Sequence, residues 1–205
     1  MIERVPVRTS PKLFDLAVSK VQAVLANITW LDHVFGICEK LTDVKDGKKF
    51  HSANAYIGKG QYEQIMPCDT LGNFAFFILR DPQALSTNGN NTISSPVSLI
   101  LWYDMRKVSL PTDERNREQI KGQIMGVLNR LHIANLEITR IYEKPDNVFG
   151  DFSYDQTDNR FLMHPFAGLR IDGYMTVRAD CFTFPNEGVG NGSFSDESFD
   201  QSSDL

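Results

Sequence analysis

The chain has 205 residues, of which 41% are hydrophobic and 11% aromatic, and its 21 basic and 26 acidic residues give a net charge of −5. This size and composition predict one buried core that needs no disulfide or metal, and they exclude a collagen-like, low-complexity or wholly disordered protein. No apolar run approaches the roughly 18–20 residues of a membrane helix, and the first residues lack the apolar stretch of a signal peptide. We therefore expect a protein that is made in a cytoplasm, stays in water and has no membrane partner.

The acidic excess lies at the C-terminus. Pro185–Leu205 contains five acids and no Lys or Arg, which leaves 21 basic and 21 acidic residues in positions 1–184. A neutral body argues against a dedicated nucleic-acid reader, although it is compatible with lining a DNA channel. The tail is rich in Gly, Ser, Asp and Asn, so we expect it to be disordered in isolation, with Phe194 and Phe199 as isolated apolar groups.

The first half of the chain predicts one helix followed by strands. The helix is expected over Pro11–Asn27, with Ser10 as its cap and apolar residues on one face. Turn residues and alternating apolar positions then predict four strands: Val34–Leu41, Phe50–Ile57, Gln61–Met66 and Phe74–Leu79. The polar segment Ser86–Pro96 is expected to be a flexible tip or insertion, and its central part, Thr87–Ile93, is expected to order only against a neighbouring protein.

The second half adds a strand, a helix and two further strands, at Val97–Met105, Asp113–Leu131, Leu136–Tyr142 and Gly168–Phe182, with an irregular connection over Lys144–Asp158. This order predicts an α+β fold: an antiparallel or mixed sheet with two amphipathic helices packed on one face. We expect this domain to occupy residues 1–184 and the acidic tail to occupy 185–205.

The strand Gly168–Phe182 has the clearest alternation in the chain. Four of its charges, Arg170, Asp172, Arg178 and Asp180, fall on one predicted face with Tyr174 and Thr176 between them. Such a ladder is either a solvated sheet face or a contact between identical subunits of a ring.

Gly122 and Gly126 lie one turn apart in the second predicted helix, nearly opposite its apolar face. A glycine inside a helix costs up to about 1 kcal/mol relative to alanine. The two glycines are either simply tolerated, or they allow the backbone of a neighbouring subunit to approach closely.

Residues with catalytic or metal-binding chemistry are scattered. The three cysteines (Cys38, Cys68 and Cys181) and the four histidines (His33, His51, His132 and His164) show no zinc-site or disulfide spacing. Asp151, Asp155 and Asp158 have a weak Ca²⁺-loop spacing that turn chemistry explains better. We expect no cofactor, no metal and no catalytic residue.

With the elements in order, the chain resembles the tail-completion or tail-terminator proteins of tailed bacteriophages. The elements that carry the resemblance are the helix Pro11–Asn27, the strand Val97–Met105, the helix Asp113–Leu131, the strand Leu136–Tyr142 and the closing strand Gly168–Phe182. The resemblance covers roughly residues 10–184, and it extends to phages that infect Bacteroidetes, including the crAss-like group. The extra strands over Phe50–Met66, the loop Ser86–Pro96 and the acidic tail depart from the family pattern.

The resemblance implies a structural virion protein and no enzyme. Members of the family form a ring of twelve or six copies in the neck, contact the portal and other neck or tail proteins, surround the packaged double-stranded DNA without reading its sequence, and help retain the genome until ejection. The charge ladder, the two helix glycines and the two phenylalanines of the tail supply the candidate interface residues: Arg170, Asp172, Arg178, Asp180, Gly122, Gly126, Phe194 and Phe199.

Two other classes stay open. A ligand-binding or enzymatic α+β domain needs a pocket with convergent polar groups, for which Asp104, Arg106, His33 and Tyr103 are candidates. A host-attachment or carbohydrate-binding module would use exposed aromatic residues, for which Tyr154, Phe161 and Phe166 are candidates.

Overall fold

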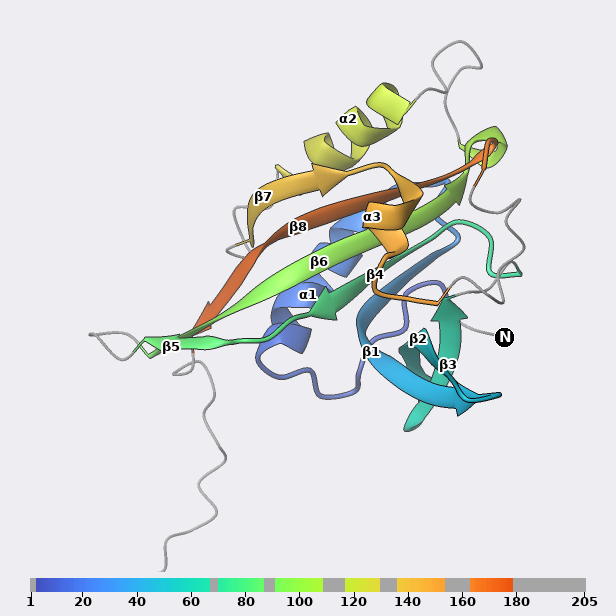
Figure 1. The fold of residues 1–205 in the computed structure, drawn as a ribbon. Helices are drawn as coiled ribbons and strands as arrows, with labels where there is room; N and C mark the ends of the chain where they lie inside the picture. Colours follow the sequence, from blue (N-terminus) through green and yellow to red (C-terminus); the bar gives the residue numbers. More distant parts are fainter. Residues whose placement is uncertain are drawn as a thin grey trace, which may run out of the picture.

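The computed structural model of the chain describes residues 3–66, 70–86, 91–108, 117–129, 136–153 and 163–178. About half of these residues belong to one mixed sheet with helices on its faces (Figure 1). Within the described ranges, the helices are α1 (Phe14–Leu25), α2 (Arg117–Leu128) and α3 (Pro145–Phe149), and a 3₁₀ turn, η1, lies at Met105–Lys107. The strands are β1 (His33–Lys45), β2 (Lys48–Gly58), β3 (Gln61–Met66), β4 (Phe74–Leu79), β5 (Ala84–Ser86), β6 (Thr92–Asp104), β7 (Leu136–Tyr142) and β8 (Phe166–Arg178).

The sheet has the strand order β3-β2-β1-β4-β6-β8-β7, and β5 pairs with the first residues of β6. The start of β1 runs parallel to β4, while all other pairs are antiparallel. β6 and β8 pair along their whole lengths, from Thr92 opposite Arg178 to Asp104 opposite Phe166. The predicted α+β fold with a mixed sheet is therefore confirmed.

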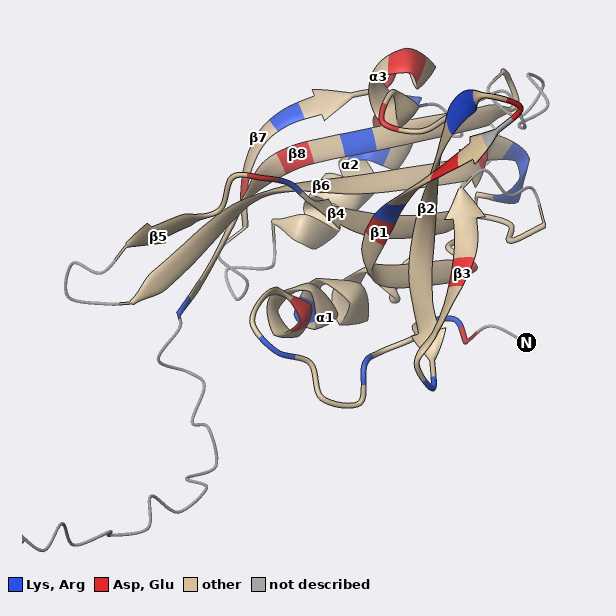
Figure 2. Ribbon diagram, turned by 60° about the horizontal axis from the view of Figure 1, so that its bottom comes forward, with Lys and Arg blue, Asp and Glu red and all other residues tan. Residues whose placement is uncertain are grey.

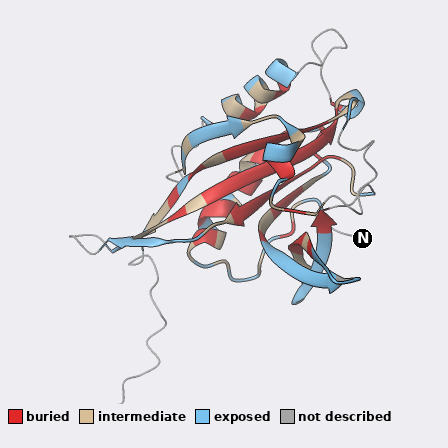
Figure 3. Ribbon diagram, viewed as in Figure 1, coloured by how far each residue is buried: buried red, intermediate tan, exposed pale blue. Residues whose placement is uncertain are grey.

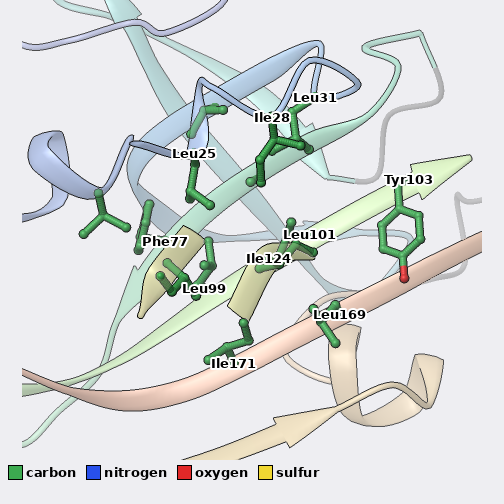
Figure 4. Packing of buried hydrophobic residues seen from close by; sticks show 14 of the residues in the cluster. Leu25, Ile28, Leu31, Phe77, Leu99, Leu101, Tyr103, Ile124, Leu169 and Ile171 are labelled. Atoms are coloured by element: carbon green, nitrogen blue, oxygen red, sulfur yellow. The ribbon is translucent and has the colours of Figure 1, made fainter. Parts of the chain in front are cut away.

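α1 and α2 cover one face of this sheet, as the sequence predicts. Figure 4 shows Leu25 and Ile28 from the first helical region and Ile124 from α2 packed around Leu99 and Leu101 of β6. The β8 residues Leu169 and Ile171 complete this layer, and all of these side chains are at most 2% exposed. Burying a side chain of this size contributes about 1.5–3 kcal/mol, so the two helices are fixed mainly by this core.

The opposite face is covered by the β2–β3 hairpin and by α3, a short helix in the segment for which the sequence predicts irregular structure. Phe149 of α3 packs with Phe76 and Trp102 of the sheet. Trp102 also stacks on Phe166, with ring centroids 5.1 Å apart. α3 is therefore anchored by a second aromatic core, and it lies over the same face that carries the charged side chains of β8.

Two local predictions are wrong. The first helix begins at Phe14 and Leu13 precedes it, so Ser10 is not its cap. The physical reason is a turn before the helix, in which the Asp15 N–H donates to the Lys12 carbonyl. Residues 92–96, predicted as part of a flexible loop, belong to β6 because β8 supplies a partner for each of them.

Candidate functional site

The inner half of β8 holds a cluster of charged side chains beneath α3. Arg170 donates from Nε to Asp172 Oδ1 at 2.7 Å and from Nη2 to Asp172 Oδ2 at 3.0 Å. Asp172 also accepts from the Ser98 hydroxyl of β6 at 2.6 Å. Arg170 and Asp172 lie two residues apart on β8 and therefore share a face, and the β6–β8 register places Ser98 directly opposite Asp172.

The α3 region contributes further groups to this cluster from the side that faces the sheet. Asp151 forms ion pairs with Arg170, at 3.1 Å, and with Arg80 at the end of β4. Arg170 Nη1 donates to the carbonyl of Asn147 at 3.2 Å, and its guanidinium lies 5.5 Å from the centre of the Tyr142 ring. The cluster thus joins β4, β6, β7, β8 and α3, and Figure 2 shows the charged positions of β8 lying close to α3.

Burial and neighbouring charges have opposite effects on the pKa values of Arg170 and Asp172. Burial raises the pKa of Asp172, but the hydrogen bonds from Arg170 and Ser98 outweigh it, so the pKa is lowered overall. Burial likewise lowers the pKa of Arg170, and the neighbouring carboxylates more than restore it. Both groups are therefore charged at neutral pH.

These contacts correct the predicted open charge ladder. Arg170 is only 8% exposed, and its partners Asp172 and Asp151 belong to the same chain. Asp180 lies outside the described residues. Of the predicted ladder, only the part from Tyr174 to Arg178 faces outward in the described structure, with Tyr174 48% exposed.

That outward part belongs to a projection that we call the arm: β5, residues 92–96 of β6 and residues 174–178 of β8. Figure 1 shows the arm reaching beyond the helices at one end of the sheet, and Figure 3 shows β5 exposed. β6 pairs with β5 on one side and with β8 on the other, so the arm is a continuous three-stranded sheet.

The arm has two different faces. On one face Leu85, Ile93 and Val177 lie directly opposite one another across the three strands, and we call this row the apolar stripe. Ile93 and Val177 pack against the core formed with α1 and α2, whereas Leu85 is 66% exposed. On the other face Thr176 donates to Ser94 at 3.2 Å. The stripe therefore extends the main core beyond the helices.

The apolar stripe is not predicted from the sequence. Its residues are distant in sequence, and two of them fall in or next to the segment predicted as a loop. The detectable signal is the alternation of Ile93 with Thr92 and Ser94, which is typical of a half-buried strand.

Gly122 and Gly126 lie on the exposed side of α2, opposite Ile120 and Ile124, as predicted. A Cβ atom added at either glycine would meet no atom within 4 Å. Nothing within the described chain therefore requires glycine at these positions, and their possible role at a subunit contact stays a prediction.

The residues proposed for a ligand pocket do not converge. Asp104 binds Arg106, accepting from Nη2 at 2.8 Å, and its carboxylate also accepts from the Arg106 backbone N–H at the start of η1. Tyr103, the preceding residue of β6, points to the opposite face, and burial raises its pKa to about 12. His33 stacks on Phe35, with ring centroids 5.5 Å apart. These side chains make structural contacts on different faces of the sheet.

Several candidate residues lie outside the described parts of the chain: Phe194, Phe199, Asp155, Asp158, Tyr154, Phe161, His132, Cys68 and Cys181. Phe166 is described, and it stacks on Trp102 instead of facing outward, which corrects its assignment as an exposed aromatic. Cys38 is a buried free thiol, and burial raises its pKa. Within the described residues, no group of three or more His, Cys, Asp or Glu side chains is placed to hold a metal ion.

A scan against protein-family models finds no matching family, and a search of curated proteins finds no matching sequence. Among the described helices, none combines the length and the apolar character needed to cross a membrane.

Proposed function

We propose that the chain is a structural virion protein of a tailed bacteriophage, which forms a ring of six or twelve copies in the head-to-tail connector. In this role it is no enzyme. It contacts the portal and other neck or tail proteins, surrounds the DNA channel, and helps hold the genome until ejection. The resemblance of the ordered elements to tail-terminator proteins gives the proposal its specific form.

The observation that carries the proposal is the arm. It projects beyond the helices and carries an exposed leucine in register with core residues on one face, and the exposed Tyr174 and Arg178 farther along β8. A projection that leaves such side chains exposed suits a contact with a neighbouring copy. The contact proposed for the charged strand is therefore restricted to its outer part, because Arg170 and Asp172 are paired within the chain.

The near-neutral body is consistent with a position beside DNA that is close but unspecific. Residues 1–184 contain equal numbers of basic and acidic residues, 21 of each. A wall of this charge neither binds phosphates tightly nor repels them strongly. The acidic tail would be repelled by the phosphates of the DNA, so its place is toward other proteins.

Native mass spectrometry of the purified chain across a range of concentrations tests the proposal, followed by mixing with the portal protein of the same genome. The proposal predicts a closed assembly of six or twelve copies, alone or on the portal. A monomer or dimer under all of these conditions contradicts it and favours a ligand-binding, enzymatic or attachment role.

A further inference from the structure

The apolar stripe is an incomplete piece of core. Leu85, Ile93 and Val177 stand in one row across three strands, and Leu85 at the outer end is 66% exposed. Aromatic side chains bury 150–250 Å² each and pack well across such a pleated surface. The stripe is therefore suited to receive an apolar side chain from another segment.

The C-terminal segment has the chemistry to occupy the stripe. The 27 residues after Arg178 contain six acids and no Lys or Arg, and residues 1–178 contain 21 basic and 20 acidic residues. The C-terminal segment is thus strongly acidic, whereas the rest of the chain is nearly neutral. Arg178 itself is exposed at the edge of the arm, and within the described part of the chain it forms no ion pair, so it is available to an acidic segment.

The proposed ring makes a neighbouring copy the acceptor of this segment. β8 ends at Arg178, at the tip of the arm. Phe194 and Phe199 follow 16 and 21 residues later. Such a segment spans up to about 50–70 Å when extended, which is enough to reach the arm of an adjacent subunit.

We propose that the apolar stripe of one copy is the docking site for the C-terminal tail of a neighbouring copy. Phe194 or Phe199 packs on Leu85, and the acidic residues beside it lie near Arg178. This inference rests on the proposed ring and names the surface that joins its members. One docked aromatic offsets only part of the entropy lost on ordering a tail, so stable docking depends on many tails acting together.

Photo-crosslinking in the full chain tests this contact. A photoreactive benzoylphenylalanine replaces Phe194 or Phe199, one at a time, and copies with normal and heavy nitrogen are mixed before irradiation. We expect crosslinked peptides that join copies of different mass and that contain Leu85, Ile93 or Val177. The same photoreactive residue at Ser198 is the position control, and its yield on the stripe is expected to be lower.

Matched substitutions then test the stripe itself. Leu85→Ser is expected to reduce the crosslink yield about tenfold, because the aromatic loses its apolar partner. Val44→Ser changes an apolar side chain of similar exposure, 69%, in β1, far along the chain from the arm, and is expected to leave the yield unchanged. Equal yields in the two variants overturn the inference.

Crosslinks confined to one copy, or directed to surfaces other than the arm, also overturn it. Native mass measured on the same samples separates this failure from failure of the proposed function. An intact ring without stripe crosslinks removes the docking site and leaves the ring, whereas the absence of any ring removes both.

Discussion

The two halves of β8 share one sequence pattern and have different surroundings. In the inner half, Arg170 and Asp172 pair with each other and with groups of β6 and the α3 region. In the outer half, Tyr174 and Arg178 face outward. The alternation of side chains along a strand predicts which residues share a face. Whether that face is buried depends on which other segment of the chain packs against it. Here the segment around α3 covers one half and leaves the other open.

Removing the arginine of the inner half has the largest expected effect. Arg170→Ala is expected to lower the free energy of unfolding by about 3–5 kcal/mol, because it leaves the carboxylate of Asp172 without its charged partner and leaves Asp151 with Arg80 alone. Arg178→Ala in the outer half is the matched control, and it is expected to change the free energy of unfolding by less than about 0.5 kcal/mol. Urea denaturation at pH 7 measures both. Similar losses in the two variants would erase the distinction between the halves.

Gly173 lies at the boundary between the two halves of β8. Its replacement is expected to cause the second-largest loss of stability. A Cβ atom at this position would collide with the backbone carbonyl of Glu137 in β7, near the irregular pairing between Ile138 and Arg140. Backbone cannot yield as a flexible side chain does, so Gly173→Ala is expected to cost about 1–3 kcal/mol of stability. Chemical denaturation measures the loss, and an unchanged midpoint would show that β7 adapts freely.

On the exposed side of α2, replacing a glycine is expected to increase stability. Because nothing crowds the position, Gly126→Ala is expected to stabilise the monomer by about 0.5–1 kcal/mol. Thermal unfolding measures this gain, and native mass measured on the same variant tests the predicted subunit contact. Higher monomer stability with weaker assembly supports the contact; higher stability with unchanged assembly means that the glycines are simply tolerated.

The smallest expected effect is on the pH dependence of stability. The native pKa of Asp172 lies below its ordinary value of 3.8, so the pair stabilises the fold above that value. This contribution is lost as the pH falls through 3.8 toward the lowered native pKa. The free energy of unfolding is measured by chemical denaturation at a series of pH values between 7 and 3. At the acid end it is expected to decrease less steeply with pH for Asp172→Asn than for the wild type. A steeper fall in the variant would contradict the assigned direction.

The elements predicted correctly from the sequence are those whose boundaries are set by a local pattern of residues. β3, β4 and β7 have the predicted boundaries because each is a short apolar or alternating run between turn residues. Residues 92–96 were assigned to a loop because Ser94, Ser95 and Pro96 have low strand propensity, and only pairing with distant β8 makes them a strand.

The candidate site was predictable only in part for the same reason. The alternation placed Arg170 and Arg178 on one face, and it carried no information about α3, whose segment lies about twenty residues earlier. The stripe joins Leu85 to Val177, which are 92 residues apart, so no local pattern indicates it.

The central claim is that the outer half of β8 joins copies of the chain. Native mass spectrometry of Arg178→Glu beside the wild type, with thermal unfolding of both, tests it most directly. We expect the wild type to assemble and the variant to remain monomeric with a nearly unchanged unfolding temperature, because Arg178 is exposed and has no ion pair within the described residues. A variant that assembles as the wild type does would contradict the claim.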